Sequence, residues 1–383
     1  MTRRFDIVLF GATGFTGGLT AEYLLAHAPE EARVALAGRS EARLAAVRDR
    51  LGRPDVELVT ADSADRDSLR LLAESTRVLI STVGPYLEHG RELVAACAEA
   101  GTDYLDLTGE PQFVDETYLA HHATAQASGA RLVHACGFDS IPHDLGAYFT
   151  VRQLPDGVPL RLRGVVRASG TASGGTFGSA LNQFASMREA SRVSRERRKR
   201  EGRPEGRRVR ATGGKVHRDP VLGYWLVPLP TIDPFIVVRS AAALPQYGPD
   251  FGYAHYAGLK RRRTLAMAAP ALLGLVAAAQ VGPLRRWLLR RVPEGTGPDP
   301  AKRERSWFRV TFVGEGGGRT VTTRVSGGDP GYAETSKMLA ESALCLAFDD
   351  NPHTSGQVTT AQAMGDRLLE RLIAAGIRFE VVE

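Results

Sequence analysis

Cysteine is scarce in this chain, which has only Cys97, Cys136 and Cys345 among its 383 residues. Their number is odd and their spacing is wide, so the sequence excludes a disulfide framework and favours a reducing compartment. The first residues, Met-Thr-Arg-Arg, lead directly into a short apolar run, which is not the form of a secretory signal peptide. We therefore expect a cytoplasmic protein that is long enough for two domains.

Acidic residues are missing from one stretch and outnumbered in another. Residues 260–291 carry eight Lys and Arg and no acid, and residues 188–218 carry 13 Lys and Arg against four Glu. The whole chain has a net charge of +6, so the remainder is an acidic body with two basic inserts. No aromatic platform or nucleic-acid motif accompanies the inserts, and we expect no nucleic acid partner. They favour an anionic surface, either a membrane or an acyl-carrier partner.

Glycine is concentrated in one turn near the N-terminus. Residues 5–10 predict a buried parallel strand, and residues 19–25 predict the helix that follows. The turn between them is Gly11, Ala12, Thr13, Gly14, Phe15, Thr16, Gly17. Such glycines let the backbone turn tightly and approach a pyrophosphate at the helix N-terminus, where N–H groups and the helix dipole favour negative charge. In this position the GxxGxxG spacing predicts dinucleotide binding.

The end of the second predicted strand, 33–38, indicates which dinucleotide is bound. An NAD site would usually place Asp or Glu there, whereas this sequence has Arg39 and Ser40. A guanidinium and a hydroxyl suit a 2′-phosphate, so we predict NADP(H). Asp62, after the third strand, is expected near the adenine. Val83, Gly84, Pro85 and Tyr86, after the fourth strand, are expected near the nicotinamide.

Strand and helix patterns alternate up to about residue 136 and then change. The predicted strands are 5–10, 33–38, 56–60, 78–82, 103–107 and 131–135, and the predicted helices are 14–28, 41–51, 65–74, 89–100 and 112–128. This order predicts an α/β fold with an N-terminal doubly wound parallel-sheet Rossmann domain, residues 1–139. Residues 140–330 predict a second α+β domain on a mixed or antiparallel sheet.

The strand-like runs of that second domain are 160–168, 224–229 and 235–239, followed by a hairpin of 307–313 and 319–325. Residues 331–383 are expected to pack back on the first domain, with helices at 332–348 and 357–375 and a terminal strand at 376–382.

Two segments stand apart from this pattern. Residues 188–218 are polar and without periodicity, and predict a solvated loop. Residues 264–284 are almost wholly apolar and flanked by basic residues. Pro270 and the many alanines argue against a membrane span. Three alternatives stay open: contact with the membrane surface through 260–291 on the inner face of the plasma membrane, a buried helix or homodimer interface, and a true span.

Several blocks resemble a known family. They are the glycine turn, residues 83–86, 104–110 (Tyr-Leu-Asp-Leu-Thr-Gly-Glu), 136–142 (Cys-Gly-Phe-Asp-Ser-Ile-Pro), 173–176 (Ser-Gly-Gly-Thr), 331–335 and 363–366. The chain resembles the saccharopine-dehydrogenase-like oxidoreductases, and most closely the actinobacterial trans-acting enoyl reductases. The resemblance implies an NADPH-dependent reductase. Members of this branch reduce an α,β-double bond in a chain held by a polyketide synthase that lacks its own reductase domain, in lipid or glycolipid synthesis.

The resemblance transfers no catalytic residues, so candidates come from the chemistry. Enoyl reduction needs stabilisation of an enolate oxygen and a proton for the α-carbon. Tyr86 is a candidate donor, or else an aromatic wall beside the nicotinamide. Asp139 and Ser140 are candidates to act on substrate or nicotinamide, or else they cap a helix. The acyl or polyketide chain would arrive on a carrier protein or on CoA.

Other assignments are open or disfavoured. His143 and Asp144 are an acid–base option, and residues 173–176 are expected to close over substrate or cofactor. His134, Cys136 and His143 lack the spacing and the fourth ligand of a zinc site, so no metal is expected. The competing functions are a saccharopine-type amino-acid dehydrogenase and a non-catalytic NADP(H)-binding protein at lipid surfaces.

Overall fold

The computed structural model describes residues 3–169, 187–261 and 300–382, together with 264, 274, 278, 281–284 and 287. These residues form two compact units. Unit 1 contains residues 3–138 and 331–375, and unit 2 contains residues 139–330 and 376–382 within the described ranges. The turn at 173–176 and most of the apolar segment 264–284 lie outside the described residues.

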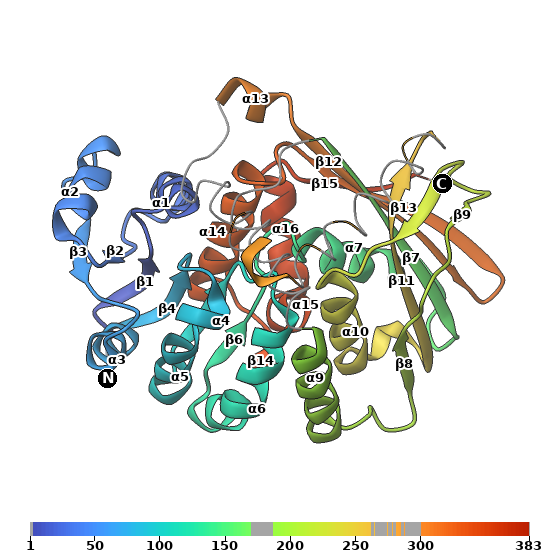
Figure 1. The fold of residues 1–383 in the computed structure, drawn as a ribbon, viewed down its shortest axis with the longest axis horizontal. Helices are drawn as coiled ribbons and strands as arrows, with labels where there is room; N and C mark the ends of the chain where they lie inside the picture. Colours follow the sequence, from blue (N-terminus) through green and yellow to red (C-terminus); the bar gives the residue numbers. More distant parts are fainter. Residues whose placement is uncertain are drawn as a thin grey trace. The chain divides into compact units, whose positions relative to one another are not determined.

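Unit 1 is built on a seven-stranded sheet in the order β14-β6-β5-β4-β1-β2-β3, in which every pair is parallel. The strands are β1 (Phe5–Phe10), β2 (Val34–Gly38), β3 (Glu57–Thr60), β4 (Thr76–Ser81), β5 (Asp103–Asp106), β6 (Arg131–Val133) and β14 (Gly356–Val358). All six residues of β1 are buried, as an inner strand covered on both faces requires. The sheet confirms the predicted doubly wound fold (Figure 1).

Nine helices in the described part of unit 1 surround this sheet. They are α1 (Phe15–His27), α2 (Glu41–Arg50), α3 (Arg66–Ser75), α4 (Tyr86–His89), α5 (Arg91–Ala100), α6 (Pro111–Ser128), α14 (Ala333–Phe348), α15 (Thr360–Ala363) and α16 (Gly365–Ala374). Helix α14 contacts α1, β4 and β5, although more than 200 residues separate it from them in the chain. The core between helices and sheet includes Phe10, Leu79, Tyr104 and Phe113.

One predicted boundary in this unit is wrong. Residues 356–358 form the edge strand β14, not the start of a helix, and β14 pairs with β6 in parallel. The helix begins later because Thr359 forms a capping box with Gln362, which satisfies backbone N–H groups at the first turn of α15.

Unit 2 contains an eight-stranded mixed sheet, in the order β15-β13-β12-β7-β11-β10-β9 with β8 also pairing with β11. The strands are β7 (Leu160–Ser169), β8 (Arg208–Ala211), β9 (His217–Arg218), β10 (Trp225–Pro228), β11 (Asp250–Leu259), β12 (Trp307–Gly316), β13 (Arg319–Gly327) and β15 (Arg378–Val381). Strand β11 is parallel to β7 and β8, and the other pairs are antiparallel. This confirms the predicted mixed sheet.

The helices of unit 2 are α7 (Ile141–Val151), α9 (Met187–Glu201), α10 (Asp233–Ala243), the short 3-10 helix η1 (Pro245–Tyr247) and α13 (Pro300–Glu304). The predicted strand 235–239 is wrong, because this stretch lies within α10. Its β-branched run favoured a strand, but Pro234 in the first turn favours a helix start. The terminal strand is also corrected, since β15 pairs with β13 in unit 2.

The predicted loop at 188–218 is wrong over most of its length. Residues 187–201 form α9, and residues 208–211 and 217–218 form strands. Opposite charges spaced by three or four residues support the helix, with Arg192 pairing to Glu189 and Glu196. Arg197 is buried and its guanidinium lies 4.5 Å from the centre of the Phe235 ring. An Arg-rich sequence can therefore carry a packed helix face, since arginine stems cover apolar surface.

Candidate active site

The glycine turn after β1 is held by close backbone contacts. Gly11 has φ +94°, a left-handed conformation that favours glycine. A Cβ atom on Gly11 would lie 2.6 Å from Oγ1 of Thr82, and one on Gly17 would lie 2.1 Å from the carbonyl oxygen of Gly11. The Thr82 hydroxyl donates to the carbonyl oxygens of Phe10 and Gly11. These contacts bring β1, the turn and α1 together without room for a side chain.

The first turn of α1 is open to an anion. Its N-cap is Gly14, and no side chain in the described part of the protein caps it. A Cβ atom on Gly14 would have one close contact, 3.4 Å to the Gly11 carbonyl oxygen, so this glycine faces a roomier side than Gly11 or Gly17. N–H groups in the first turn of a helix have no intrahelical acceptor. The geometry is compatible with a pyrophosphate at residues 11–17, and that role stays a prediction.

The groups predicted to select the cofactor follow the carboxyl ends of β2 and β3. Arg39 comes directly after β2 and is exposed, which suits a cation that meets a phosphate. The Ser40 hydroxyl accepts from the backbone N–H of Arg43 and caps α2. Asp62 follows β3, and its carboxylate accepts from the N–H of Ala64. Arg39 thus lies as the prediction requires, whereas Ser40 and Asp62 also organise their own loops.

Residues 83–85 lie between β4 and α4, and Tyr86 begins α4, at the carboxyl edge where the nicotinamide is predicted. Tyr86 is buried, and its hydroxyl donates to the carbonyl oxygen of Ser81 at 3.0 Å and accepts from the N–H of Leu107 at 3.2 Å. Burial, with the charge of Asp106, raises the pKa of Tyr86 well above its ordinary value. The geometry favours packing over the donor role for Tyr86.

Buried carboxylates tie the neighbouring loops together. Asp106 accepts from the N–H groups of Thr108 and Ala135 and lies 2.6 Å from Nδ1 of His134. Glu110 accepts from the N–H of Leu87 at 2.9 Å. His134 and Asp106 thus form a loop-fixing pair within unit 1, whereas His143 belongs to unit 2.

Asp139 and Ser140 open helix α7 at the start of unit 2. The backbone carbonyl of Ser140 accepts from the N–H groups of His143 and Asp144, but its side chain makes no cap hydrogen bond. The Ser140 hydroxyl is fully buried and has no partner among the residues that the structure describes. Burial, with the charge of Asp233, raises the pKa of Asp139 to about 6 against the opposing charge of His143. A buried free hydroxyl therefore stands beside a carboxyl that holds its proton more tightly than usual.

The sequence analysis missed a buried cluster in unit 2. Nδ1 of His143 lies 2.7 Å from Oδ1 of Asp233, and Nε2 of His255 lies 3.5 Å from Oδ2 of the same carboxylate. Burial lowers the pKa of His255 to about 4, although the charge of Asp233 opposes this shift. Burial would raise the pKa of Asp233, but the two histidines and Thr231 outweigh it and lower that pKa. No motif links these positions, which come together only through the sheet and its helices.

Asp144, the other member of the predicted acid–base option, pairs with Ser240. Its Oδ1 accepts from the Ser240 hydroxyl at 2.5 Å, and the side chain is fully buried. The pairing joins α7 to α10 within unit 2.

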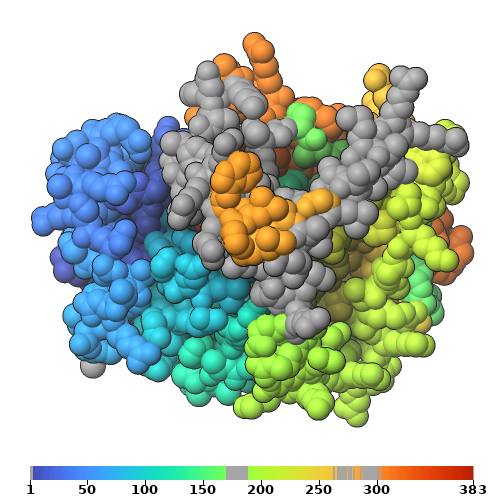
Figure 2. Space-filling model, viewed as in Figure 1, coloured from blue at the N-terminus to red at the C-terminus, as the bar shows by residue number. Residues whose placement is uncertain are grey.

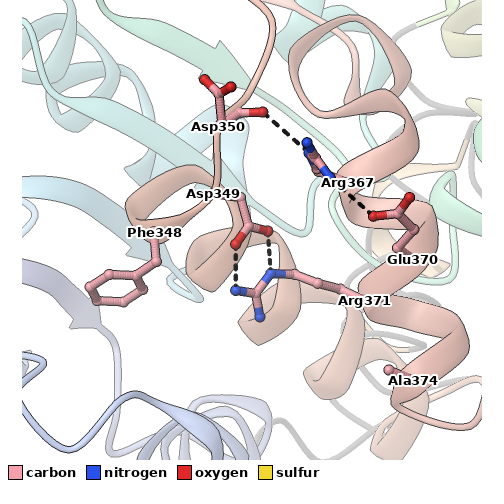
Figure 3. A pocket seen from close by; sticks show the side chains of 7 residues that line it. All are labelled: Phe348, Asp349, Asp350, Arg367, Glu370, Arg371 and Ala374. Atoms are coloured by element: carbon pink, nitrogen blue, oxygen red, sulfur yellow. Dashed lines mark hydrogen bonds and ion pairs between the residues drawn. The ribbon is translucent and has the colours of Figure 1, made fainter.

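A surface hollow of about 490 Å³ lies at the C-terminal helices of unit 1. Its lining consists of Phe348, Asp349, Asp350, Arg367, Glu370, Arg371 and Ala374. Figure 3 shows the Arg371 guanidinium facing the carboxylate of Asp349, and Arg371 also pairs with Glu341 at 3.2 Å. Arg371 pairs with Asp349 and Arg367 with Glu370, and none of the lining residues comes from the glycine turn or the loops after β2, β3 and β4. We do not assign it to the active site.

A parallel sheet with this glycine turn is typical of a nucleotide-binding domain, and comparison with known proteins identifies the class of enzyme. Residues 7–133 match the family model for the saccharopine dehydrogenase NADP binding domain. A Mycobacterium tuberculosis protein provisionally named a trans-acting enoyl reductase is 40% identical over 413 residues, covering 99% of this chain and 97% of the relative. The trans-acting enoyl reductase of Mycobacterium ulcerans is 37% identical, covering 98% and 97%.

The solved structures agree at the level of the fold. Saccharopine dehydrogenase from Saccharomyces cerevisiae matches with a TM-score of 0.57 and 11% identity, covering 99% of this chain and 100% of that one. The chain belongs to the saccharopine-dehydrogenase-like family, in which its full-length relatives are trans-acting enoyl reductases. It is an NADP(H)-dependent oxidoreductase.

Helices in the described part of the chain are all too short or too polar to cross a membrane.

Proposed function

We propose that this oxidoreductase reduces the α,β-double bond of an acyl or polyketide thioester in lipid or glycolipid biosynthesis. The observation that carries the proposal is the 37–40% identity to trans-acting enoyl reductases over nearly the whole of both chains. Likeness over the nucleotide-binding domain alone would indicate only the cofactor. Here it extends through unit 2, which must supply substrate contacts in any two-domain dehydrogenase of this kind.

The chain's own residues would hold the cofactor and leave the hydride to it. The N-terminal end of α1 would bind the pyrophosphate, and Arg39 with Ser40 would bind the 2′-phosphate. Bound NADPH supplies the hydride that reaches the β-carbon. Val83, Gly84 and Pro85, at the carboxyl edge of β4, would form the wall beside the nicotinamide, with Tyr86 holding that loop in place.

Ser140 and Asp139 are our candidates for the remaining chemistry. A buried hydroxyl without a partner in the described structure is costly unless a ligand completes it, so Ser140 would donate to the thioester carbonyl or to the nicotinamide amide. The Asp139 carboxyl, whose pKa burial raises to about 6, would hold a proton for the α-carbon at mildly acidic pH. The hydrogen bond to the enolate oxygen would stabilise its charge, and one proton at the α-carbon with one hydride at the β-carbon would complete the addition of hydrogen across the double bond.

The basic helix α9 supports an anionic carrier as the source of the acyl chain. Arg195, Arg198 and Lys199 are exposed on this helix, which lies at the surface in Figure 2, coloured bright green. Acyl carriers and CoA both present phosphate, and cationic surfaces steer such partners. Contact with a membrane surface through 260–291 stays a proposal, supported by the exposed side chains of Val281, Leu284 and Trp287.

Turnover with defined thioesters tests this function. The purified chain is mixed with NADPH and a trans-2-enoyl thioester on CoA or on a carrier protein, and the saturated product is identified by mass spectrometry. We expect consumption of NADPH and the saturated thioester, with no turnover of saccharopine. Tight binding of NADPH without turnover of any enoyl thioester would favour a non-catalytic protein, and oxidation of saccharopine would favour the amino-acid dehydrogenase.

Two variants resolve the roles of the candidates. Ser140→Ala and Asp139→Asn should each lower kcat at least about tenfold while leaving the Kd for NADPH within about twofold. A normal kcat in both would remove them from the chemistry. A large rise in Kd for NADPH from Ser140→Ala would instead assign its hydroxyl to the nicotinamide.

A further inference from the structure

We propose that His143, Asp233 and His255 form a binding site for a divalent transition-metal ion of the zinc class. The proposal concerns unit 2 alone and does not depend on the identity of the substrate. The sequence offered no metal motif, because the three residues are separated by 90 and 22 positions.

Three separate elements bring the ligands together. His143 lies in the first turn of α7, Asp233 is the first residue of α10, and His255 lies in the middle of β11. All three are buried, and one ligand atom from each lies within 4.8 Å of the others. The two imidazole rings meet edge to face with centroids 4.9 Å apart. Such convergence of two imidazoles and a carboxylate is unusual in a protein core, where histidine and aspartate are seldom buried.

Neighbouring hydroxyls fix the orientation of two ligands. The Tyr253 hydroxyl lies 3.2 Å from Nδ1 of His255, which leaves the opposite ring nitrogen, Nε2, facing Asp233. The Thr231 hydroxyl donates to Oδ2 of Asp233 at 2.5 Å. Outer partners of this kind, which hold the far nitrogen of a histidine and one oxygen of a carboxylate, are characteristic of metal centres.

The donor set identifies the class of ion. Two neutral imidazole nitrogens and one carboxylate oxygen are typical zinc ligands, and three protein ligands leave a fourth position for water or another small ligand. Mg²⁺ and Ca²⁺ prefer sites made only of oxygen, so they fit poorly.

The distances show what binding would change. Ligand atoms about 2.0–2.1 Å from a tetrahedral zinc ion lie roughly 3.3 Å from one another. The two nitrogens face different oxygens of Asp233, because Nε2 of His255 lies 3.5 Å from Oδ2 and Nδ1 of His143 lies 2.7 Å from Oδ1. The second distance is shorter than that spacing, so an ion held by Oδ1 would move the His143 ring away from the carboxylate by several tenths of an ångström. The competing arrangement is a hydrogen-bonded network with no ion.

Metal titration of the full chain decides between them. The protein is stripped with a chelator, dialysed and titrated with Zn²⁺ by calorimetry and with Co²⁺ by visible absorption. We expect one equivalent of either ion, with the intense visible absorption of four-coordinate Co²⁺. Asp233→Asn and His255→Gln should weaken binding on the order of 100-fold or more. The matched control is His353→Gln, which changes an exposed histidine in unit 1. This variant should still bind one equivalent of Zn²⁺ or Co²⁺.

Two results would overturn the site: a folded wild-type chain that binds neither ion, and binding that Asp233→Asn and His255→Gln leave unchanged. Circular dichroism checks that the variants are folded. If they are not, X-ray absorption of the zinc-loaded wild-type chain gives the answer. Two imidazole ligands support the site, and a sulfur ligand or an oxygen-only shell contradicts it.

Discussion

The carbonyl oxygen of Gly11 lies so close to Gly17 that a Cβ atom on Gly17 would be only 2.1 Å from it. This contact joins the strand end to the first turn of α1, and it explains why position 17 is glycine. The same close approach sets the N-terminus of α1 beside the strand end, where a helix favours an anionic group such as a pyrophosphate.

Gly17→Ala should therefore disrupt the cofactor site. The methyl group would push α1 away from the turn, and we expect NADPH affinity to fall by about 3 kcal/mol, or roughly 100-fold. Calorimetric titration with NADPH measures the loss. Gly213→Ala is the matched control, because a Cβ atom there meets nothing within 4 Å and should change neither binding nor stability. Unchanged affinity in Gly17→Ala would show that the pyrophosphate binds elsewhere.

Arg39→Ala tests the preference for the phosphorylated cofactor. Loss of charge-assisted hydrogen bonds to the 2′-phosphate should weaken NADPH binding by about 1.5–3 kcal/mol, roughly 10- to 150-fold, and leave NADH binding nearly unchanged. Arg77→Ala serves as the control, since Arg77 is exposed at the opposite, amino edge of the sheet and should not affect either nucleotide. Equal losses for the two nucleotides would remove the phosphate role of Arg39.

Tyr86→Phe separates packing from catalysis. The hydroxyl bridges Ser81 and Leu107, so its removal should destabilise unit 1 by about 1 kcal/mol. Because the geometry commits this hydroxyl to the backbone, we expect kcat to stay within about threefold of the wild type. Urea unfolding and steady-state kinetics give the two values. A much larger fall in kcat with unchanged stability would restore Tyr86 as the proton donor.

Asp6 makes stability depend on pH in a defined direction. Burial alone would raise its pKa, but the hydrogen bonds and charge of Arg33 and the charge of Arg77 outweigh burial and hold the pKa below its ordinary value. A lowered pKa in the folded state stabilises the protein above the unfolded-state pKa, about 3.9, and this stabilisation is lost as pH falls through the lower folded value.

Asp6→Asn should therefore cost about 1 kcal/mol at neutral pH, because Arg33 is half exposed and solvent screens the pair. The difference from the wild type should shrink below about pH 3.9. Urea unfolding at several pH values measures it, with Asp55→Asn, at an exposed ion pair, as a control that changes little. An Asp6→Asn difference that grows on acidification would contradict this sign.

The parallel sheet of unit 1 could be predicted because its strands carry near-continuous apolar runs and its first turn carries glycines with a physical purpose. The same reasoning failed where tertiary contacts override local preference. The run Ile236-Val237-Val238 favours a strand, yet it lies in α10. Strand β11, in the second sheet, was not predicted from the sequence. Its polar residues and the glycines at 252 and 258 interrupt the apolar pattern that is typical of a strand.

The candidate site shows the same division. Residues 11–17 could be predicted because they directly follow the first strand, and Arg39 because it directly follows the second. Asp233 and His255 could not be predicted as site residues. They lie at the start of a helix and in a strand further along the chain, and no sequence motif has that spacing. The burial of the Tyr86 hydroxyl against Ser81 and Leu107 was also beyond a sequence pattern.

Transfer of label from NADPH is the most direct test of the central claim. The chain is incubated with NADPH deuterated at the transferable position of the nicotinamide and with a trans-2-enoyl thioester on a carrier protein. The account predicts a saturated thioester that carries one deuterium at its β-carbon. A chain that binds NADPH but returns the enoyl thioester unreduced and unlabelled would contradict it.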